Sequence, residues 1–432
     1  MRSLKELAAS ILCAYALCTS TSMAQHDNAI DVMVEISHTA IENRLRLDFD
    51  GAEFSGQAWE RLVSEAAQAQ FVMIGEEHGI AENPMLVAQL FHEISDYEYK
   101  NLVIETSPAM AKFIDGVLLR DGLEGLRNLY AKRGGEPAFF GMHEEALLLA
   151  AARETSSRKK PVLIGVDYEV ASDPVLLRVL SDKRKPQEAE EALDLLIAAS
   201  DAAWKKYYQT SGPQFIFSFS GDPELVRAVE DAWPERDEEA AWILDTLEET
   251  LEINKLWVNR QAWQSNARRA AFIRSNFLRH WNDRAKNDGG PKMIVKLGAS
   301  HLVRGRNMVE TFDLGALLPE LAEINGTRAL SIMVLPGAGS MTAVLDPTTW
   351  TFREAPGKDS YAAGLEVITA TAYEDAFTLI DLRPIRSHLT PSLAKDYDDL
   401  ARIVHGFDML LVLSGSTASA EFDHVPPSRD VE

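Results

Sequence analysis

The stretch Phe71-Val-Met-Ile-Gly-Glu-Glu-His-Gly-Ile-Ala-Glu82 decides the fold of this chain and contains its first candidate functional residues. Its four leading apolar residues are typical of a buried strand. The following Asn83-Pro84 predicts the start of a helix, because asparagine is a favoured N-cap and proline at the first helical position needs no N–H donor. Carboxylates and a histidine therefore lie between the end of a strand and a helix, where α/β folds gather ligands and catalytic groups.

Three later segments repeat this arrangement of an apolar strand that ends in an ionisable side chain. They are Leu102–Glu105, Pro161–Asp167 and Lys292–His301. Further strands are expected at residues 328–335, 377–382 and 407–413. If the sheet is parallel, the carboxyl ends of its strands lie along one edge and can converge on one pocket. We therefore predict an α/β fold with a mostly parallel central sheet flanked by helices.

The region from residue 172 to residue 288 has a different character. Apart from an ambiguous apolar run at Phe215–Phe219, it shows no convincing strand, and its apolar residues recur at helical spacing. We predict a helical insertion or cap between two parts of the α/β core, residues 25–171 and 289–415. Residues 416–432 are rich in serine, proline and acidic residues, and we predict a loose C-terminal tail.

The N-terminus has the pattern of a secretory signal peptide. A basic start is followed by a mostly apolar run over residues 7–17 and by the small residues of Ser22-Met23-Ala24. We predict that residues 1–24 are removed before Gln25 and that the mature protein is periplasmic or secreted. A lipoprotein signal at Cys18 is the weaker alternative, because the preceding leucine is not small. The run is too short to span a bilayer, so we expect no integral membrane segment in the mature chain.

Composition narrows the classes of function. Both cysteines, Cys13 and Cys18, lie in the predicted signal peptide, so the mature chain has no disulfide, thiol nucleophile or zinc–thiolate site. The formal net charge is −23, and removal of the signal peptide, which carries a net +1, leaves −24. Such a negative field makes nucleic acid and anionic membranes poor partners. We expect a small-molecule substrate as the partner, and the sequence is silent on the oligomeric state.

The clustered acidic residues and histidines suggest two kinds of chemistry. A histidine beside a carboxylate can act as a general base toward water, with the carboxylate orienting the ring. Two histidines with carboxylates could instead bind a divalent metal, and the candidate ligands are then His78, Glu76, Glu105 and His301. The sequence has no His-Glu-x-x-His, Gly-x-Ser-x-Gly or Walker A motif, so it does not indicate an ordinary serine hydrolase or a P-loop protein.

Other polar residues complete the candidate site. Arg269 and Asn276 are seven residues apart, so they share one face of a long predicted helix, and Arg269 could bind a carboxylate or a developing oxyanion. Each residue alone could equally be structural, since a strand-end acid can cap the next helix and an arginine can form a surface salt bridge. The candidate catalytic residues are His78, Glu76, Glu105, His301 and Arg269. The candidate substrate-binding residues are Glu77, Glu82, His143, Asp167 and Asn276.

These residues are similar to the signature of a known family. Ile74–Glu82 resembles the Gly-Glu…His-Gly…Glu signature of erythromycin esterase-like proteins, whose relatives include the ChaN/Tiki haem-uptake group. Later motifs agree in order, and the similarity spans residues 45–415. These motifs are Val103–Glu105, Ile164–Asp167, Arg269 with Asn276, Ala299–His301 and Phe407-Asp408.

The resemblance implies an α/β core with a helical subdomain and a pocket rich in histidine and glutamate. In the esterases a histidine activates water against an ester without a covalent serine. Carried over to this chain, the base would be His78 and its partners would be Glu76, Glu105 and His301. Arg269 would bind the substrate or the oxyanion.

The spacing of the first motif departs from that of the esterases. They place two residues between the first glutamate and the histidine, whereas here only Glu77 intervenes. This shorter Gly-Glu-x-His form is similar to the ChaN/Tiki branch, which implies haem or metal binding, or metal-dependent hydrolysis. The leading hypothesis is a secreted esterase-like hydrolase. The alternatives are a haem- or metal-binding protein of the cell envelope and a non-catalytic protein that binds a small molecule.

Overall fold

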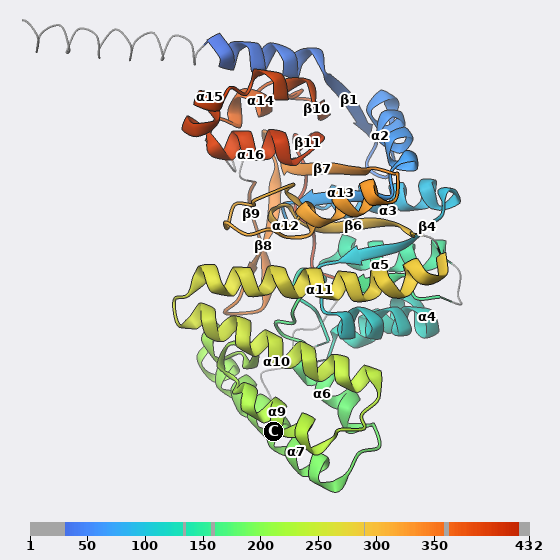
Figure 1. Ribbon diagram of the computed structural model, residues 1–432, viewed down its shortest axis with the longest axis vertical. Coiled ribbons are helices and arrows are strands. Elements are labelled where there is room, and N and C mark those ends of the chain that lie inside the picture. Colours follow the sequence, from blue (N-terminus) through green and yellow to red (C-terminus); the bar gives the residue numbers. More distant parts are fainter. Residues whose placement is uncertain (1–30, 133–134, 157–159, 289, 358–362, 423–432) are drawn as a thin grey trace, which may run out of the picture.

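A computed structural model describes residues 31–132, 135–156, 160–288, 290–357 and 363–422 (Figure 1). Across these residues, the main sheet has nine strands in the order β2-β1-β10-β11-β7-β3-β6-β4-β5. Its strands are β1 (Arg44–Phe49), β2 (Phe54–Ser55), β3 (Phe71–Glu76), β4 (Tyr99–Ile104), β5 (Leu163–Gly165), β6 (Lys292–Gly298), β7 (Ala329–Pro336), β10 (Phe377–Asp381) and β11 (Met409–Leu413). From β11 to β5, each pair of neighbouring strands is parallel. The β2–β1, β1–β10 and β10–β11 pairs are antiparallel. The predicted α/β fold with a mostly parallel sheet is therefore confirmed.

Strand β3 lies in the middle of the sheet and is buried on both faces, as expected for a continuous apolar run in a parallel sheet. Val72 and Ile74 pack into one core with helices on the first face, and Phe71 and Met73 pack into a second core with helices on the other. The helices of the first face are α2 (Gly56–Gln68), α3 (Glu82–Ile94), α4 (Pro108–Tyr130) and α5 (His143–Thr155). Those of the second face are α11 (Ala262–Asp288), α12 (Ala299–Leu302), α13 (Leu314–Ile324), α14 (Glu366–Thr369), α15 (Pro391–Asp396) and α16 (Asp398–Gly406).

The region from residue 172 to residue 288 is helical, as its periodicity predicts. Figure 1 shows most of it as a separate layer on the β4 side of the sheet, with the long helix α11 between the two. Its other helices are α6 (Asp173–Ser181), α7 (Gln187–Thr210), α8 (Phe217–Ser220), α9 (Pro223–Ala232) and α10 (Glu238–Val258). The ambiguous run at Phe215–Phe219 belongs to a short 3-10 turn and to α8, and its aromatic rings pack into the helical core.

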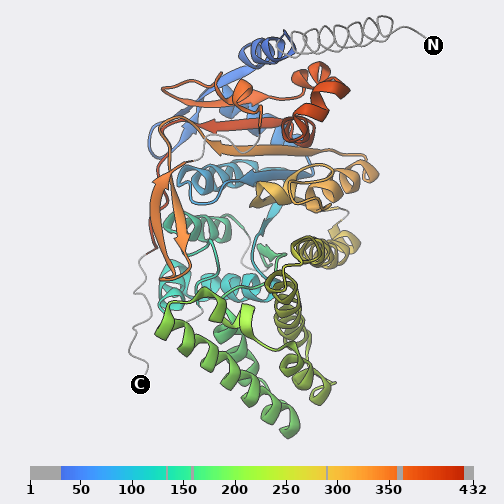
Figure 2. The ribbon, with the colours of Figure 1, turned by 90° about the vertical axis from the view of Figure 1, so that its left-hand side faces the viewer.

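A two-stranded hairpin that the sequence analysis did not anticipate extends from the sheet toward the helical region (Figure 2). Its strands are β8 (Met341–Asp346) and β9 (Thr351–Pro356). The Ala343 amide donates to the Gly79 carbonyl at 2.9 Å, and the Tyr207 hydroxyl of α7 donates to the Pro347 carbonyl at 3.1 Å. Gly79 has φ +89°, and a Cβ there would lie 2.1 Å from the Ala343 oxygen. The turn after β3 and the hairpin therefore fit together only with glycine at this position.

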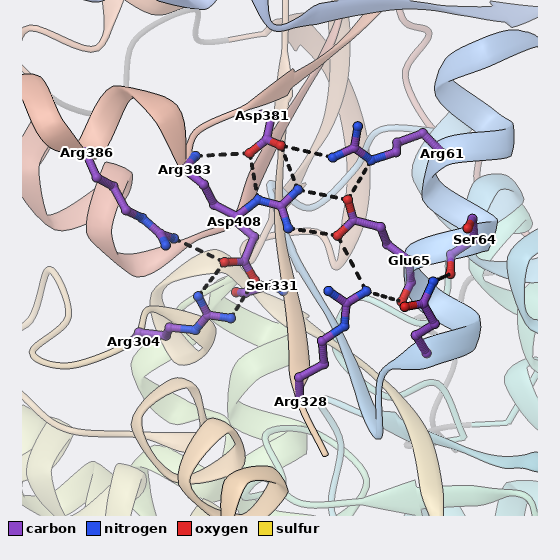
Figure 3. A network of polar contacts seen from close by, with 11 residues as sticks. Arg61, Ser64, Glu65, Arg304, Arg328, Ser331, Asp381, Arg383, Arg386 and Asp408 are labelled. Carbon is purple, nitrogen blue, oxygen red and sulfur yellow. Dashed lines mark hydrogen bonds and ion pairs between the residues drawn. The ribbon is translucent and has the colours of Figure 1, made fainter. Parts of the chain in front are cut away.

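A network of arginines and carboxylates holds the edge of the sheet where β7 and β11 begin (Figure 3). Asp408, just before β11, accepts hydrogen bonds from Arg304 (2.5 and 2.6 Å), from Arg386 (3.1 Å) and from the Ser331 amide (3.1 Å). Burial alone would raise the pKa of Asp408, but the arginine contacts, Arg304 first, hold it below its usual value. The Phe-Asp motif of the sequence therefore has a structural role at the edge opposite the candidate site.

The C-terminal segment is packed as far as Phe422, which contradicts the prediction of a loose tail from residue 416. The Phe422 ring is fully buried and meets the Tyr130 ring edge-on at 5.7 Å. The Thr417 amide donates to the Glu82 carboxylate at 3.0 Å. Aromatic burial and these backbone contacts, which the composition does not reveal, hold the segment in place. Residues 423–432 and the predicted signal peptide, residues 1–24, lie outside the described residues. Among the helices of the described residues, none is long and apolar enough to cross a membrane.

Candidate active site

The register of the central strands brings the predicted strand-end residues together. Glu76 at the end of β3 pairs with Gly298 at the end of β6, and His301 follows three residues later on α12. Glu105 follows β4 and Asp167 follows β5, and these strands continue the same parallel register. Because parallel strands end at the same edge, residues more than 200 positions apart in sequence share one site.

His78 is held in place by a carboxylate and an aromatic ring. Its Nδ1 lies 2.9 Å from Glu76 Oε1, and its ring stacks on Phe139 with 4.0 Å between centroids. Its Nε2 lies 3.7 Å from Glu105 Oε2. Burial alone would lower the pKa of His78, but the hydrogen bond to Glu76 and the charge of Glu105 raise it above the ordinary 6.5. An ionised Glu76 can only accept, so neutral His78 keeps its proton on Nδ1 and exposes a lone pair on Nε2.

Helix α3 starts two residues earlier than predicted. It begins at Glu82 after Ala81, so Asn83 is not the N-cap, and Pro84 lies within the first turn. The Asn83 side chain instead donates a hydrogen bond back to Glu76 Oε2. The residue that the sequence indicates as a helix cap therefore orients a carboxylate of the site.

Glu105 is the central anion of the site. Its carboxylate accepts hydrogen bonds from Arg269 Nη2 at 2.8 Å and from the Gly298 amide at 2.6 Å, and it lies 3.4 Å from His301 Nε2. Burial alone would raise the pKa of Glu105, but the charges of His301, His78 and Arg269 hold it well below the usual range. Glu105 is therefore ionised at neutral pH.

His301 and Arg269 form the cationic wall of the site. His301 Nδ1 lies 2.7 Å from Asp313 Oδ2, whose carboxylate also caps α13. Burial alone would lower the pKa of His301, but Glu105 and Asp313 outweigh it and raise the pKa to about 10. Arg269, on α11, donates to both oxygens of Asp167. Both cations are thus charged at neutral pH, which suits the stabilisation of a developing oxyanion.

These groups line one cavity of about 750 Å³, a size typical of a small-molecule site. Its polar end contains Glu76, His78, Glu105, Asp167, Arg269 and His301. Its apolar walls come from the loop before α5, the helical region, the loop before α13 and the β8–β9 hairpin. The larger apolar residues are Phe139, Pro213, Ile216, Phe219, Met308, Val309, Leu345, Pro347 and Trp350.

Four of the predicted substrate-binding residues are absent from the lining of this cavity. Glu82 and His143 hold the C-terminal segment, through the Thr417 amide and the Ala420 carbonyl respectively. The Asn276 amide donates to the Val166 carbonyl at 3.0 Å and so fixes the chain after β5. Glu77 is also absent from the cavity lining. Asp167 alone of this group lines the cavity.

Sequence reasoning missed four residues that orient the catalytic candidates. Phe139 and Asp313 each contact one of the histidines. Lys296 and Glu145 are buried behind Glu76, where Lys296 Nζ lies 2.6 Å from each carboxylate. The available signal was a lysine inside the otherwise apolar run Met293–Leu297, since a buried lysine requires a partner.

The carboxylates of the site are matched by cationic side chains and not arranged around a metal. Glu76 contacts Lys296, and Glu105 contacts Arg269. Within the described residues, no group of three or more histidine, cysteine, aspartate or glutamate side chains is arranged to hold a metal ion. The predicted metal set of His78, Glu76, Glu105 and His301 therefore does not fit a metal in this arrangement.

Comparison with known proteins identifies the fold. No family model and no curated protein sequence matches the chain. A mutant of the erythromycin esterase EreC in its open conformation has a TM-score of 0.59 at 14% identity, covering 87% of this chain and 98% of the esterase. A succinoglycan biosynthesis protein has a TM-score of 0.57 at 13% identity, covering 91% and 99%. A protein from Bacillus cereus has a TM-score of 0.57 at 15% identity, covering 90% and 99%.

These comparisons show that the chain shares the α/β fold of these proteins. Its fold is that of an erythromycin esterase, so the divergent resemblance seen in the motifs is confirmed at the level of the fold. The roles of the individual site residues stay predictions.

Proposed function

We propose that this protein is an esterase-like hydrolase in which His78 activates water to attack an ester or related bond of a small molecule. The observation that carries the proposal is the orientation of His78. Glu76 and Phe139 hold its ring, and its Nε2 borders the cavity close to Glu105. A base that is fixed in this way, with cations nearby, can act on a bound carbonyl group.

The reaction follows from the hydrogen bonds of the site. Water gives a proton to His78 Nε2 while its oxygen bonds to the carbonyl carbon, and the carbonyl oxygen becomes an oxyanion. Arg269 and protonated His301 stabilise this charge electrostatically. The bond from carbon to the leaving oxygen then breaks, and His78 returns its proton to the leaving alkoxide. Glu76 stabilises the intermediate imidazolium through Nδ1.

The charges of the site define a working range of pH. His78 acts as a base only when neutral, so activity rises as the pH increases through its pKa, which lies above 6.5. His301 acts as a cation only when protonated, so activity falls as the pH increases past about 10. We therefore expect a bell-shaped dependence of kcat on pH with an alkaline optimum.

The alternative of a ChaN/Tiki-like haem- or metal-binding protein is not favoured. The carboxylates that a metal would need are paired with Lys296 and Arg269. Secretion to the periplasm or beyond remains a proposal that rests on the pattern of residues 1–24.

The proposal is tested with a panel of p-nitrophenyl esters and lactones. His78→Ala should lower turnover by about 10²- to 10⁴-fold, the usual contribution of a general base. His405→Ala is the matched control, because His405 is exposed on α16 far along the chain from the cavity lining. Both variants should keep the wild-type circular dichroism spectrum. Undiminished turnover in His78→Ala would exclude the mechanism, and the absence of turnover in the wild type would favour a non-catalytic binding protein.

A further inference from the structure

Lys296 is a buried cation that the proposed reaction does not use directly. It lies on β6 with its side chain 1% exposed, and it does not line the cavity. Its Nζ lies 2.6 Å from Glu76 Oε1 and 2.6 Å from Glu145 Oε1 on α5. Burial of a lysine between two carboxylates is costly unless the contacts are well formed, so this arrangement requires an explanation.

The contacts of Glu76 indicate what Lys296 does. Glu76 Oε1 accepts from both Lys296 Nζ and His78 Nδ1, and Glu76 Oε2 accepts from the Asn83 side chain. Both oxygens of this carboxylate are therefore occupied by donors. The carboxylate cannot rotate about its terminal bond without the loss of the contact to His78.

The electrostatics agree with this geometry. Burial alone would raise the pKa of Glu76, but the charge of Lys296 and the contacts with His78 hold it below the ordinary value. Glu145 shares the same lysine, yet burial raises its pKa to about 7. The titratable groups that face Lys296 are thus Glu76 from β3 and Glu145 from α5, with His78 beyond Glu76. Of the two carboxylates, Glu76 is the one kept fully ionised at neutral pH.

We propose that Lys296 is a positioning residue that, with Glu145 as its second partner, locks Glu76 in the ionised and oriented state which fixes the ring and tautomer of His78. Lys296 acts on the cavity only through Glu76 and His78. The kinetic part of this inference rests on the proposed hydrolase function, whereas the effect on the His78 ring does not.

The competing explanation is a buried ion pair that only stabilises the fold. The double variant Lys296→Met/Glu145→Leu separates the two explanations, because it removes Lys296 without leaving Glu145 as an unpaired buried carboxylate, while Glu76 keeps its contacts with His78 and Asn83. If the pair only stabilises the fold, the double variant should differ from the wild type in melting temperature alone, with kcat and the state of His78 unchanged. If Lys296 is a positioning residue, the state of His78 and kcat should change even where stability is retained.

The test combines nitrogen-15 NMR of histidine-labelled full chain with kinetics on p-nitrophenyl acetate. The His78 signals are assigned by their loss in His78→Ala. In the wild type, Nδ1 should carry the proton and Nε2 should be unprotonated at a pH above the His78 pKa. In the double variant, the two nitrogen shifts should move toward those of a mixture of tautomers. The value of kcat should fall by about 10- to 100-fold with KM within twofold, as expected for a displaced catalytic group.

A buried pair elsewhere serves as the control. Arg153 and Asp115 contact each other at 3.2 Å with side chains 5% and 8% exposed, outside the cavity lining. Arg153→Met/Asp115→Leu should alter stability but leave the His78 shifts unchanged. If the apolar Lys296 double variant does not fold, Lys296→Gln/Glu145→Gln replaces it and carries the same expectations.

The outcomes are distinct. Wild-type His78 shifts in a folded Lys296 double variant would overturn the inference. Changed shifts with an inactive wild-type protein would support the positioning role while the proposed hydrolase function fails. Changed shifts with a reduced kcat would support both.

Discussion

Substitution of Glu105 by glutamine tests whether this carboxylate keeps His301 charged. Glutamine preserves the size of the side chain but has a single acceptor oxygen. It can therefore keep only one of the hydrogen bonds from Arg269 (2.8 Å) and the Gly298 amide (2.6 Å), which go to different carboxylate oxygens. The variant also loses the negative charge 3.4 Å from His301 Nε2. The variant therefore separates the electrostatic role of Glu105 from its role in packing.

The magnitude follows from the pKa of His301. Its value of about 10 against the ordinary 6.5 corresponds to about 5 kcal/mol in favour of the charged ring, at about 1.4 kcal/mol per pKa unit. Glu105 is the largest favourable contributor and Asp313 the next. Loss of one opposite charge at this distance should lower the pKa of His301 by about 1–3 pH units.

The effect on stability has a definite sign. A histidine with a raised pKa in the folded state contributes stability that is complete below pH 6.5 and is lost as the pH rises through about 10. The wild type should therefore lose free energy of unfolding between these values. Glu105→Gln should lose less free energy of unfolding over the same pH interval, because charged His301 stabilises the folded variant less.

The assay measures urea unfolding at pH 6, 8 and 10, together with the pH dependence of ester turnover. In Glu105→Gln, the alkaline fall in kcat should shift to lower pH by about 1–3 units. Glu53→Gln is the control, because Glu53 is exposed and lies outside the cavity lining. An unchanged alkaline limb together with an unchanged pH dependence of unfolding would refute the assigned role of Glu105.

Two further substitutions probe the apolar wall and the opposite edge of the sheet. Trp350→Ala removes part of the cavity wall, so KM should rise by about tenfold with a smaller change in kcat. Steady-state kinetics measure both constants, and an unchanged KM would contradict a contact between Trp350 and the substrate. Asp408→Asn breaks the contacts with Arg304 and should cost up to about 3 kcal/mol at pH 7. Because the folded pKa of Asp408 is depressed, its contribution exists above about pH 4 and is lost as the pH falls through that pKa, so urea unfolding should show a smaller difference at pH 3.

The sequence by itself determined the local elements and their class. Runs such as Phe71–Ile74 and Met293–Val295 can be satisfied only by burial on two faces, which a parallel sheet covered by helices provides. Helical periodicity over residues 172–288 determined the insertion in the same way. The acid or histidine at the end of each strand also follows from the sequence, because in a parallel sheet such residues share one edge.

Only the tertiary structure decided which of these polar residues meet. The strand register placed Glu76 beside Gly298 and left Glu82 and His143 to bind the C-terminal segment. It also gave Lys296 its partner Glu145, 151 residues away in sequence. The cavity wall from the β8–β9 hairpin depends likewise on contacts between distant segments. Local propensity acts over a few residues, whereas these pairings are selected by the packing of the whole core, so no pattern within one segment could reveal them.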